Sequence, residues 1–549
     1  MASRKIEIYD TTLRDGSQLE GISLSVDDRI RITGELDRLG VSFIEGGFPA
    51  SNPKEAEFFG KVASLKLKNA KLVAFGGTRK VGAQTETDDN MKALLAANTP
   101  AVCLVGKSSD IQVQKVLETS LEENLSMIAD SVSYLKGKGK IVIFDAEHFF
   151  DGYKRNPEYA LRALQIAEKA GADRLVLCDT NGGTMPDEVF DIVTAVKKAT
   201  KAPLAIHAHN DAELAVANSL AAIRAGAEQV QGTINGYGER CGNANLISVI
   251  ANLKLKLGID CISDEQVARL REISSRISDI VNIPLNPQQA YVGNSAFSHK
   301  AGYHVAGIAK MASSYQHIDP AAVGNDKKVL ISELSGRSNI LYIAKELGIE
   351  LSPKGEEIRM LLQEVKERES RGFQYEGAEA SFELLIRRSQ KNYKRPFELV
   401  DFMVMVERHR RYGSNGSGGD KKDASIFTLD DKEALLSEAT VKVRVGPEVF
   451  HTAAEGNGPV NALDQALRKA LVQFYPSVAN VKLTDYKVRI VDESSGTGST
   501  VRVIIESSDG GSHQWRTMGC SQNIIEASWM ALADSLEYSL VHAREALKR

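Results

Sequence analysis

The sequence predicts an α/β protein that begins with a (β/α)8 TIM barrel, continues into a helical accessory region and ends in a small α+β domain. Strand-like and helix-like segments alternate from residue 5 to about 260. Residues 265–410 then read as helices without regular strands, and strands return after residue 426. A chain of 549 residues is too long for one hydrophobic core. We place the parts at 1–262 (barrel), 263–411 (accessory region), 412–424 (flexible linker) and 425–549 (C-terminal domain).

The barrel depends on a regular series of candidate strands. Some are continuous apolar runs, such as Leu175–Cys178, which is typical of parallel strands buried on both faces. Amphipathic stretches such as Val26–Leu39 and Leu121–Leu135 lie between them. Eight such units in about 255 residues match the size of a TIM barrel. A doubly wound open sheet is the alternative, but no GxGxxG follows the first strand. The candidate strands are 5–9, 42–46, 71–75, 100–105, 140–145, 173–178, 203–207 and 228–234.

The C-terminal domain follows a stretch rich in glycine and serine, residues 412–422, whose composition predicts a flexible linker. Beyond it, the hydrophobic pattern alternates between periods typical of strands and of helices. The expected elements are a strand at 440–445, a helix at 459–473, strands at 481–491, 500–506 and 512–518, and a helix at 522–546.

The composition excludes several classes of protein. An apolar fraction of 43% and a charged fraction of 26% are ordinary for a soluble globular chain. A net charge of -4 gives no sign of a nucleic-acid partner, and no apolar run is long enough to predict a membrane span. The five cysteines form no CxxC pair, so we expect reduced thiols and a cytoplasmic location.

Two polar clusters indicate a metal site. Arg14 and Asp15 follow the first strand, where an arginine can polarise a carbonyl oxygen and an aspartate can bind a hard cation. His207 and His209 alternate along the seventh strand and therefore point to one face. A surface ion pair and two core histidines are the ordinary alternatives. Together with Asp15, the histidines would leave positions open for a bidentate ligand such as a 2-oxo acid.

Further polar sequence motifs follow other predicted strands. In Gly236–Asn245 the glycines let the backbone approach a ligand closely, although Asn243 or Asn245 could instead cap the next helix. Glu147 follows the fifth strand and could assist proton transfer. The Thr180 hydroxyl could hold a substrate carboxylate, with a turn cap as the alternative.

One further feature concerns substrate size. Leu104 and Val105 end the fourth strand, where we expect them to form the wall of a small pocket for a methyl group.

Together these sequence motifs resemble those of one protein family. The segments DTTLRDG at 10–16, HAHND at 207–211 and GERCGNAN at 238–245 are similar to the signatures of the DRE-TIM metallolyases. Within that superfamily they resemble the Claisen-condensing synthases that make 2-isopropylmalate, homocitrate or citramalate. Phe144–Lys154 and Asn523–Trp529 resemble the citramalate synthases in particular.

The resemblance implies a divalent metal, Mg²⁺, Mn²⁺ or Zn²⁺, that binds pyruvate and is held by Asp15, His207 and His209, with Asn243 completing or supporting the set. It also implies that Arg14 stabilises the charge on the ketone oxygen and that Thr180 fixes the carboxylate.

Acid–base chemistry on acetyl-CoA is implied for Glu147, His304 and Tyr315. Relatives read His-x-Asp-Gly where this chain has His304–Gly307, so His299 is a competing candidate.

For the C-terminal domain, the resemblance implies regulation of the enzyme. Gly456–Leu463 resembles the regulatory domain of the same synthases, which implies a homodimer and inhibition by isoleucine. Three alternatives stay open: a synthase for a larger 2-oxo acid, a lyase or aldolase on the same barrel, and an amino-acid sensor without catalysis.

Overall fold

The computed structural model describes residues 5–546 except 63–64, 300–303, 305–306, 309, 327, 330–336, 350, 352–354, 376, 391, 408–435, 492 and 511–512. The predicted linker at 412–424 therefore lies outside the described residues. The chain forms two compact units, Met1–Phe297 with Gln316–Lys327, and Ser298–Tyr315 with Lys328–Arg549. The first unit thus extends beyond the predicted barrel boundary at residue 262.

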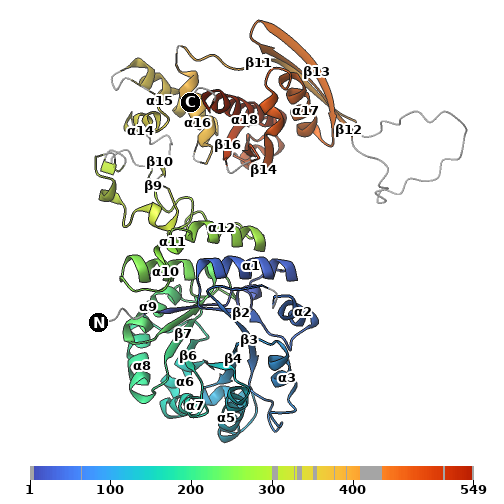
Figure 1. Ribbon diagram of the computed structural model, residues 1–549. Helices are drawn as coiled ribbons and strands as arrows, with labels where there is room; N and C mark the ends of the chain where they lie inside the picture. The colour runs from blue at the N-terminus through green and yellow to red at the C-terminus, as the bar shows by residue number, and fades with distance from the viewer. Residues whose placement is uncertain are drawn as a thin grey trace, which may run out of the picture. The chain divides into compact units, whose positions relative to one another are not determined.

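The first unit contains a closed barrel of eight parallel strands in chain order, which confirms the predicted fold (Figure 1). Every predicted strand overlaps one of them. The last strand closes the barrel on the first, with Tyr9 opposite Gln231. The strands are β1 (Glu7–Asp10), β2 (Phe43–Gly47), β3 (Lys71–Gly77), β4 (Ala101–Lys107), β5 (Ile141–Glu147), β6 (Arg174–Asp179), β7 (Leu204–Ala208) and β8 (Gln229–Gly232).

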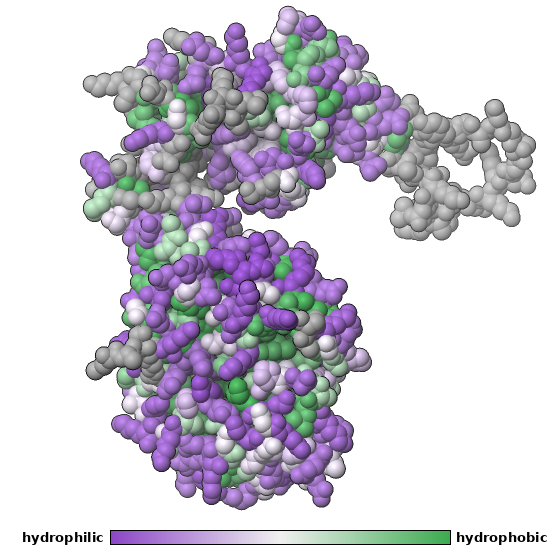
Figure 2. Space-filling model, viewed as in Figure 1, coloured by the Kyte–Doolittle hydropathy of each residue, from purple (hydrophilic) through white to green (hydrophobic). Residues whose placement is uncertain are grey.

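Amphipathic helices surround the barrel and turn polar faces outward, as the view in Figure 2 shows for one side. In α1 a capping box at Ser25 starts the helix and a left-handed Gly40 ends it, as local sequence alone would dictate. The helices are α1 (Val26–Leu39), α2 (Pro53–Val62), α3 (Asp89–Ala96), α4 (Asp110–Lys115), α5 (Leu121–Gly137), α6 (Phe149–Arg155), α7 (Pro157–Lys169), α8 (Pro186–Ala199), α9 (Ala215–Ala225), α10 (Leu246–Leu255), α11 (Asp264–Val267) and α12 (Leu270–Val281).

The strand side chains divide the core of this unit into two layers. Residues such as Tyr9, Cys103 and Val176 pack inside the barrel. Their chain neighbours, among them Leu104 and Leu177, pack between the strands and the helices. Because side chains alternate along a strand, a shift of one residue moves a side chain from one layer to the other.

The second unit carries two antiparallel sheets of three strands and a parallel pair, β9 (Ser298–His299) with β10 (Lys328–Val329). In the sheets, α17 packs against β12 and β13, and α18 against β15 and β16. The sheets are β11 (Glu398–Glu407), β12 (Leu436–Val445) and β13 (Glu448–Gly456), and β14 (Lys482–Ile490), β15 (Val501–Ser508) and β16 (Gln514–Ser521). The helices are α14 (Arg337–Glu346), α15 (Glu356–Ser370), α16 (Glu379–Arg388), α17 (Pro459–Leu471) and α18 (Ile524–Ala546).

Short 3₁₀ helices complete the described elements: η1 (Gly16–Gln18), η2 (Ile234–Gly236), η3 (Ala312–Tyr315), η4 (Pro320–Val323), η5 (Pro476–Asn480) and η6 (Glu493–Gly498). No helix among the described residues is both long and apolar enough to cross a membrane.

Besides the short strands β9 and β10, two strands of the antiparallel sheets, β11 and β13, were not predicted. The expectation of no regular strands between 265 and 410 is wrong, because β11 pairs with β12 through partners such as Phe402 and Val441. Its run Phe402–Val406 is apolar at every position and so lacks the alternation that marks a half-exposed strand. The strand β13 returns from β12 through a two-residue turn that starts at Gly446, whose φ is 59°.

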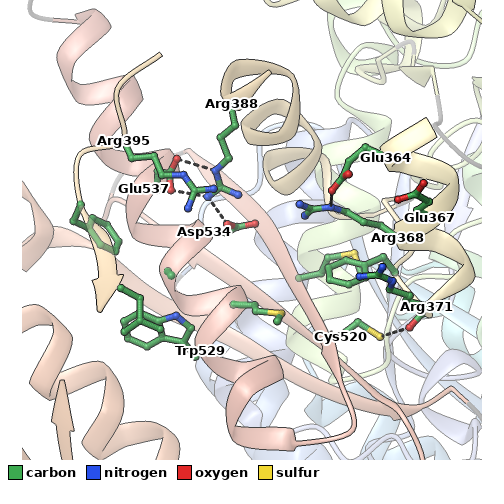
Figure 3. A pocket seen from close by; sticks show the side chains of 16 residues that line it. Glu364, Glu367, Arg368, Arg371, Arg388, Arg395, Cys520, Trp529, Asp534 and Glu537 are labelled. Atoms are coloured by element: carbon green, nitrogen blue, oxygen red, sulfur yellow. Dashed lines mark hydrogen bonds and ion pairs between the residues drawn. The ribbon is translucent and has the colours of Figure 1, made fainter. Parts of the chain in front are cut away.

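A network of buried charges joins α16 to α18 beside a cavity of about 420 Å³ (Figure 3). Arg388 donates to Asp534 Oδ1 and to Glu537 Oε2, both at 2.6 Å. The side chains of these two acids are 15% and 3% exposed. Burial raises the pKa of Asp534 above its ordinary value although Arg388 acts against it. The arginine therefore compensates two carboxylates that have lost most of their water.

Replacing Arg388 by methionine should destabilise the second unit by about 3–5 kcal/mol, because two buried carboxylates would lose their common counter-charge. Arg395→Met is the matched control, since Arg395 lines the same cavity but is exposed to solvent. Urea denaturation followed by tryptophan fluorescence would measure the change, because both tryptophans lie in the second unit. Equal losses in the two variants would contradict this account of the network.

Candidate functional site

Polar side chains from distant parts of the chain gather at the carboxyl ends of the barrel strands. Arg14 and Asp15 follow β1, His207 lies near the end of β7 with His209 just beyond it, and Asn243 lies in the loop after β8. This is the face of a TIM barrel on which active sites are built. The structure therefore places the predicted site residues at one end of the barrel.

Asp15, His207 and His209 form a possible metal-binding group. Their candidate ligand atoms all lie within 4.8 Å of one another, and all three residues are buried. His207 Nε2 lies 3.4 Å from Asp15 Oδ2. The imidazole rings are tilted, with centroids 5.2 Å apart. The predicted convergence of these residues is thus present.

The donor atoms fit a divalent metal ion. His209 Nδ1 and Asn243 Oδ1 are buried and have no hydrogen-bond partner among the described residues. Buried polar atoms are normally paired, so these two unpaired atoms near the Asp15 carboxylate suit the ligand set of a cation. Two imidazoles, a carboxylate and an amide oxygen suit ions such as Mn²⁺, Zn²⁺ or Mg²⁺.

The ionisation of these groups also favours a cation. Burial would raise the pKa of Asp15, but the charge of Arg14 and the hydrogen bond with His207 outweigh it and hold the pKa well below its usual range. Burial and repulsion from His207 lower the pKa of His209 to about 4. The site therefore offers an ionised carboxylate and a neutral imidazole near neutral pH.

The glycines of the loop after β8 make room for Asn243. Its Nδ2 donates to Asp15 Oδ1 at 2.9 Å. A Cβ atom on Gly238 would lie 2.2 Å from that nitrogen, and one on Gly242 would lie 2.0 Å from the carbonyl oxygen of Gly236. Asn245 instead caps the next helix, the alternative given for it from the sequence: its side chain accepts from Ile247 N at 3.1 Å at the start of α10.

Arg14 is held in one orientation. Its Nε donates to Glu45 Oε2 at 2.6 Å, and its Nη1 donates to Asp15 Oδ2 at 2.8 Å. The guanidinium carbon lies 4.0 Å from the ring centroid of Phe75. Glu45 also accepts from Tyr9 Oη at 2.8 Å. The arginine side chain keeps 14% exposure, which leaves part of its planar fork open at the mouth of the barrel.

Sequence reasoning missed several polar residues of the barrel interior. Glu45 was a single acid in an apolar strand, which was the available signal. Lys107, at the end of β4, forms an ion pair with Glu147, at the end of β5. Asp145 and Gln231 lie deeper and are both buried. Glu147 itself is partly exposed, as its predicted place at the barrel mouth requires.

Thr180 and Leu104 differ in their fit to the predictions. Thr180 Oγ1 accepts from His148 N at 2.8 Å, so its hydroxyl proton is still available to a substrate carboxylate. Leu104 is fully buried but packs in the outer layer, between strands and helices. By alternation its neighbour Val105 points into the barrel. The structure therefore favours Val105 over Leu104 as a wall of the substrate pocket.

The accessory histidines belong to the second unit. The rings of His304 and Tyr315 stack with centroids 4.5 Å apart, and both residues are exposed. A Cβ atom on Gly307 would lie 2.5 Å from the Tyr315 ring, which explains a glycine there. His299, the competing candidate, has a buried Nε2 with no partner among the described residues. The catalytic role of each stays a prediction.

A second candidate site adjoins the predicted regulatory turn. Residues of β13 and α17, Asn461 and Asp464 among them, line an open cavity of about 860 Å³. Asp464 Oδ2 accepts from Arg468 Nε at 2.7 Å, whereas Asp464 Oδ1 is buried without a partner among the described residues. Charges of both signs thus meet beside the first turns of α17.

Three family models match successive parts of the chain. The HMGL-like model matches residues 5–277, the "Homocitrate synthase post-HMGL domain-like" model residues 291–372, and the "LeuA allosteric (dimerisation) domain" model residues 376–540.

Relatives of known activity match almost the whole chain. An (R)-citramalate synthase of Aquifex aeolicus is 51% identical, covering 99% of both chains. One of Geobacter sulfurreducens is 50% identical, covering 98% of both. A 2-isopropylmalate synthase of Methanocaldococcus jannaschii is 31% identical, covering 97% of this chain and 94% of the relative. The chain therefore belongs to the (R)-citramalate synthase family.

Proposed function

We propose that this enzyme condenses acetyl-CoA with pyruvate and water to give (R)-citramalate and coenzyme A. The observation that carries the proposal is near-full-length identity of 51% and 50% to (R)-citramalate synthases, against 31% to a 2-isopropylmalate synthase. The product would serve a pyruvate route to isoleucine. A synthase for a larger 2-oxo acid is the second candidate, and thiol release from acetyl-CoA with pyruvate, 2-oxoisovalerate and 2-oxoglutarate distinguishes the two.

Asp15, His207 and His209 would hold the divalent ion, with the free amide oxygen of Asn243 beside them. When bound, such an ion supplies Lewis-acid polarisation of the ketone. Arg14 is placed to donate to the same ketone oxygen and to stabilise its negative charge as the new carbon–carbon bond forms. Glu45 and Asp15 keep the guanidinium in place, so little reorganisation is needed.

The remaining groups serve the carboxylate and the proton. Thr180 would donate its hydroxyl proton to the carboxylate of pyruvate. His304 would take the proton from the methyl group of acetyl-CoA, assisted by Glu147 and by Tyr315, whose ring stacks on that of His304. Water then attacks the thioester of the condensed product and releases coenzyme A.

Regulation and location complete the proposal. The cavity beside β13 and α17 presents Asp464, Arg468 and Lys469, which suits the ammonium and carboxylate of an amino acid, and we assign isoleucine to it. Similarity to a dimerisation domain supports a homodimer. All five cysteines are free thiols, which supports a cytoplasmic location.

Metal removal should abolish turnover, and Mg²⁺ or Mn²⁺ should restore it. His207→Ala and His209→Ala should each weaken Mn²⁺ binding by at least about 10–100-fold, since a ligand is lost from a small set. Isothermal titration of the metal-free protein measures this. His451→Ala, which changes an exposed histidine of β13, is the control. Unchanged Mn²⁺ affinity in His207→Ala would exclude the assigned ligand set.

Arg14→Lys should lower kcat by about 10²–10³-fold, because lysine keeps the charge but loses the planar fork that reaches the oxygen. Mn²⁺ affinity should change little. Arg29→Lys is the matched control, since Arg29 forms a buried ion pair with Glu55 in the same unit. That variant should lose stability but keep kcat, and a normal kcat in Arg14→Lys would remove Arg14 from the chemistry.

Isoleucine should inhibit turnover, and Asp464→Asn should raise the concentration needed for half-inhibition by about 10-fold or more, because a hydrogen bond between charged groups contributes about 1.5–3 kcal/mol. A point variant is preferable to cutting the chain near residue 412, because β11 lies before that position and pairs with β12 after it. Glu448→Gln, an exposed change on β13, is the control. Selective inhibition by leucine would instead favour 2-oxoisovalerate as the substrate.

A further inference from the structure

We propose that Gln231 is a positioning residue, which fixes the tautomer of His207 for metal binding and is itself oriented by Asp145. No motif contains Gln231, and both of its amide atoms are already bonded, to His207 and to Asp145. The inference rests on the proposed role of His207 as a metal ligand. It concerns the residues behind that ligand and not the ligand itself.

The three residues form a continuous chain of hydrogen bonds across the barrel interior. Gln231 lies opposite His207 in the register of β8 and β7. His207 Nδ1 lies 3.0 Å from Gln231 Oε1. On the other side, Gln231 Nε2 donates to Asp145 Oδ1 at 3.2 Å. All three residues are less than 5% exposed, so no bulk water competes for these bonds.

The direction of these bonds determines where the proton of His207 lies. An ionised carboxylate only accepts, so Asp145 requires the amide nitrogen of Gln231 on its side. The amide oxygen then faces His207, and it too only accepts. His207 therefore keeps a proton on Nδ1, so the proton that it gives up to a metal ion is the one on Nε2, the atom 3.4 Å from Asp15.

A reversed amide would have the opposite effect. Its NH₂ group would donate to Nδ1, and the proton of a neutral His207 would move to Nε2, where it blocks ligation. Second partners of this kind commonly tune metal-binding histidines. A buried glutamine also costs free energy unless its amide is bonded on both sides, which makes simple space-filling a poor reason for its presence.

The chain supplies a matched control two residues earlier on the same strand. Gln229 points to the same face of β8, is fully buried, and donates from Nε2 to Glu7 Oε2 at 3.0 Å. It belongs to the amino-terminal end of the barrel strands, away from the proposed ligands. Its Oε1 has no partner among the described residues, so Gln229→Leu removes one buried hydrogen bond where Gln231→Leu removes two. The variant therefore controls for the loss of a buried amide that does not contact a proposed ligand.

The test compares Mn²⁺ affinity, by isothermal titration of the metal-free full-length protein, in four variants. Gln231→Leu should bind Mn²⁺ about 10–100-fold more weakly than the unaltered protein. Gln229→Leu should keep its affinity within about twofold, although it too loses a buried amide hydrogen bond. Gln231→Glu, which keeps an acceptor for Nδ1–H, should retain most of the affinity. Asp145→Asn should weaken binding, because an amide at 145 no longer determines which way Gln231 faces.

A second measurement reports the proton directly. In the metal-free protein labelled with ¹⁵N-histidine, one signal that disappears in His207→Ala should show a proton on Nδ1. That signature should be lost in Gln231→Leu and kept in Gln229→Leu. Unchanged affinity and tautomer in Gln231→Leu, or an equal loss of affinity in Gln229→Leu, would overturn the proposal.

The outcomes separate this inference from the proposed function. If His207→Ala binds Mn²⁺ normally, the metal assignment fails. If the unaltered protein releases no coenzyme A with pyruvate, the assigned reaction fails while the binding and tautomer results still test Gln231.

Discussion

The site depends on one buried negative charge. Asp15 is 3% exposed, and an ionised carboxylate at that depth loses several kcal/mol of hydration. Arg14 at 2.8 Å and Asn243 at 2.9 Å compensate that loss together with His207. Each partner comes from a different part of the chain or a different loop. The need to satisfy a single carboxylate therefore draws the segments after β1, β7 and β8 to one point.

Polar side chains deeper in the barrel are also paired with one another. Arg14 is balanced by Glu45, and Glu45 is bonded in turn by the hydroxyl of Tyr9. Polar atoms in this interior are thus placed in pairs, above an apolar layer that includes Cys103 and Val176. Among the atoms left without a partner in the described residues, two belong to His209 and Asn243, which are members of the proposed ligand set. The pattern of satisfied and unsatisfied atoms marks the position at which a ligand is needed.

Much of the barrel could be predicted because buried parallel strands are recorded locally, as short apolar runs between amphipathic helices. That Asp15, His207 and His209 lie close together could also be predicted, since Arg14–Asp15 and His207–His209 each lie together at the end of one strand. Glu45 and Gln231 were not, because their partners are determined by barrel closure and strand register. Leu104 was assigned to the wrong layer although the alternation applied to the histidines could also have been applied to β4. In the second unit, β11 was hidden by a run without alternation.

The pairing of β1 with β8, which closes the barrel, has a consequence for folding during synthesis. The bond from Asn243 to Asp15 joins residues 228 positions apart, so during synthesis the amino-terminal half of the site waits for the last strand. Contacts over such a separation form late, because the loop they close is long. An ion that requires side chains from both edges binds only the closed ring. By mass action such an ion would stabilise the closed barrel, so separation of β1 from β8 would become rarer as the concentration of free ion rises.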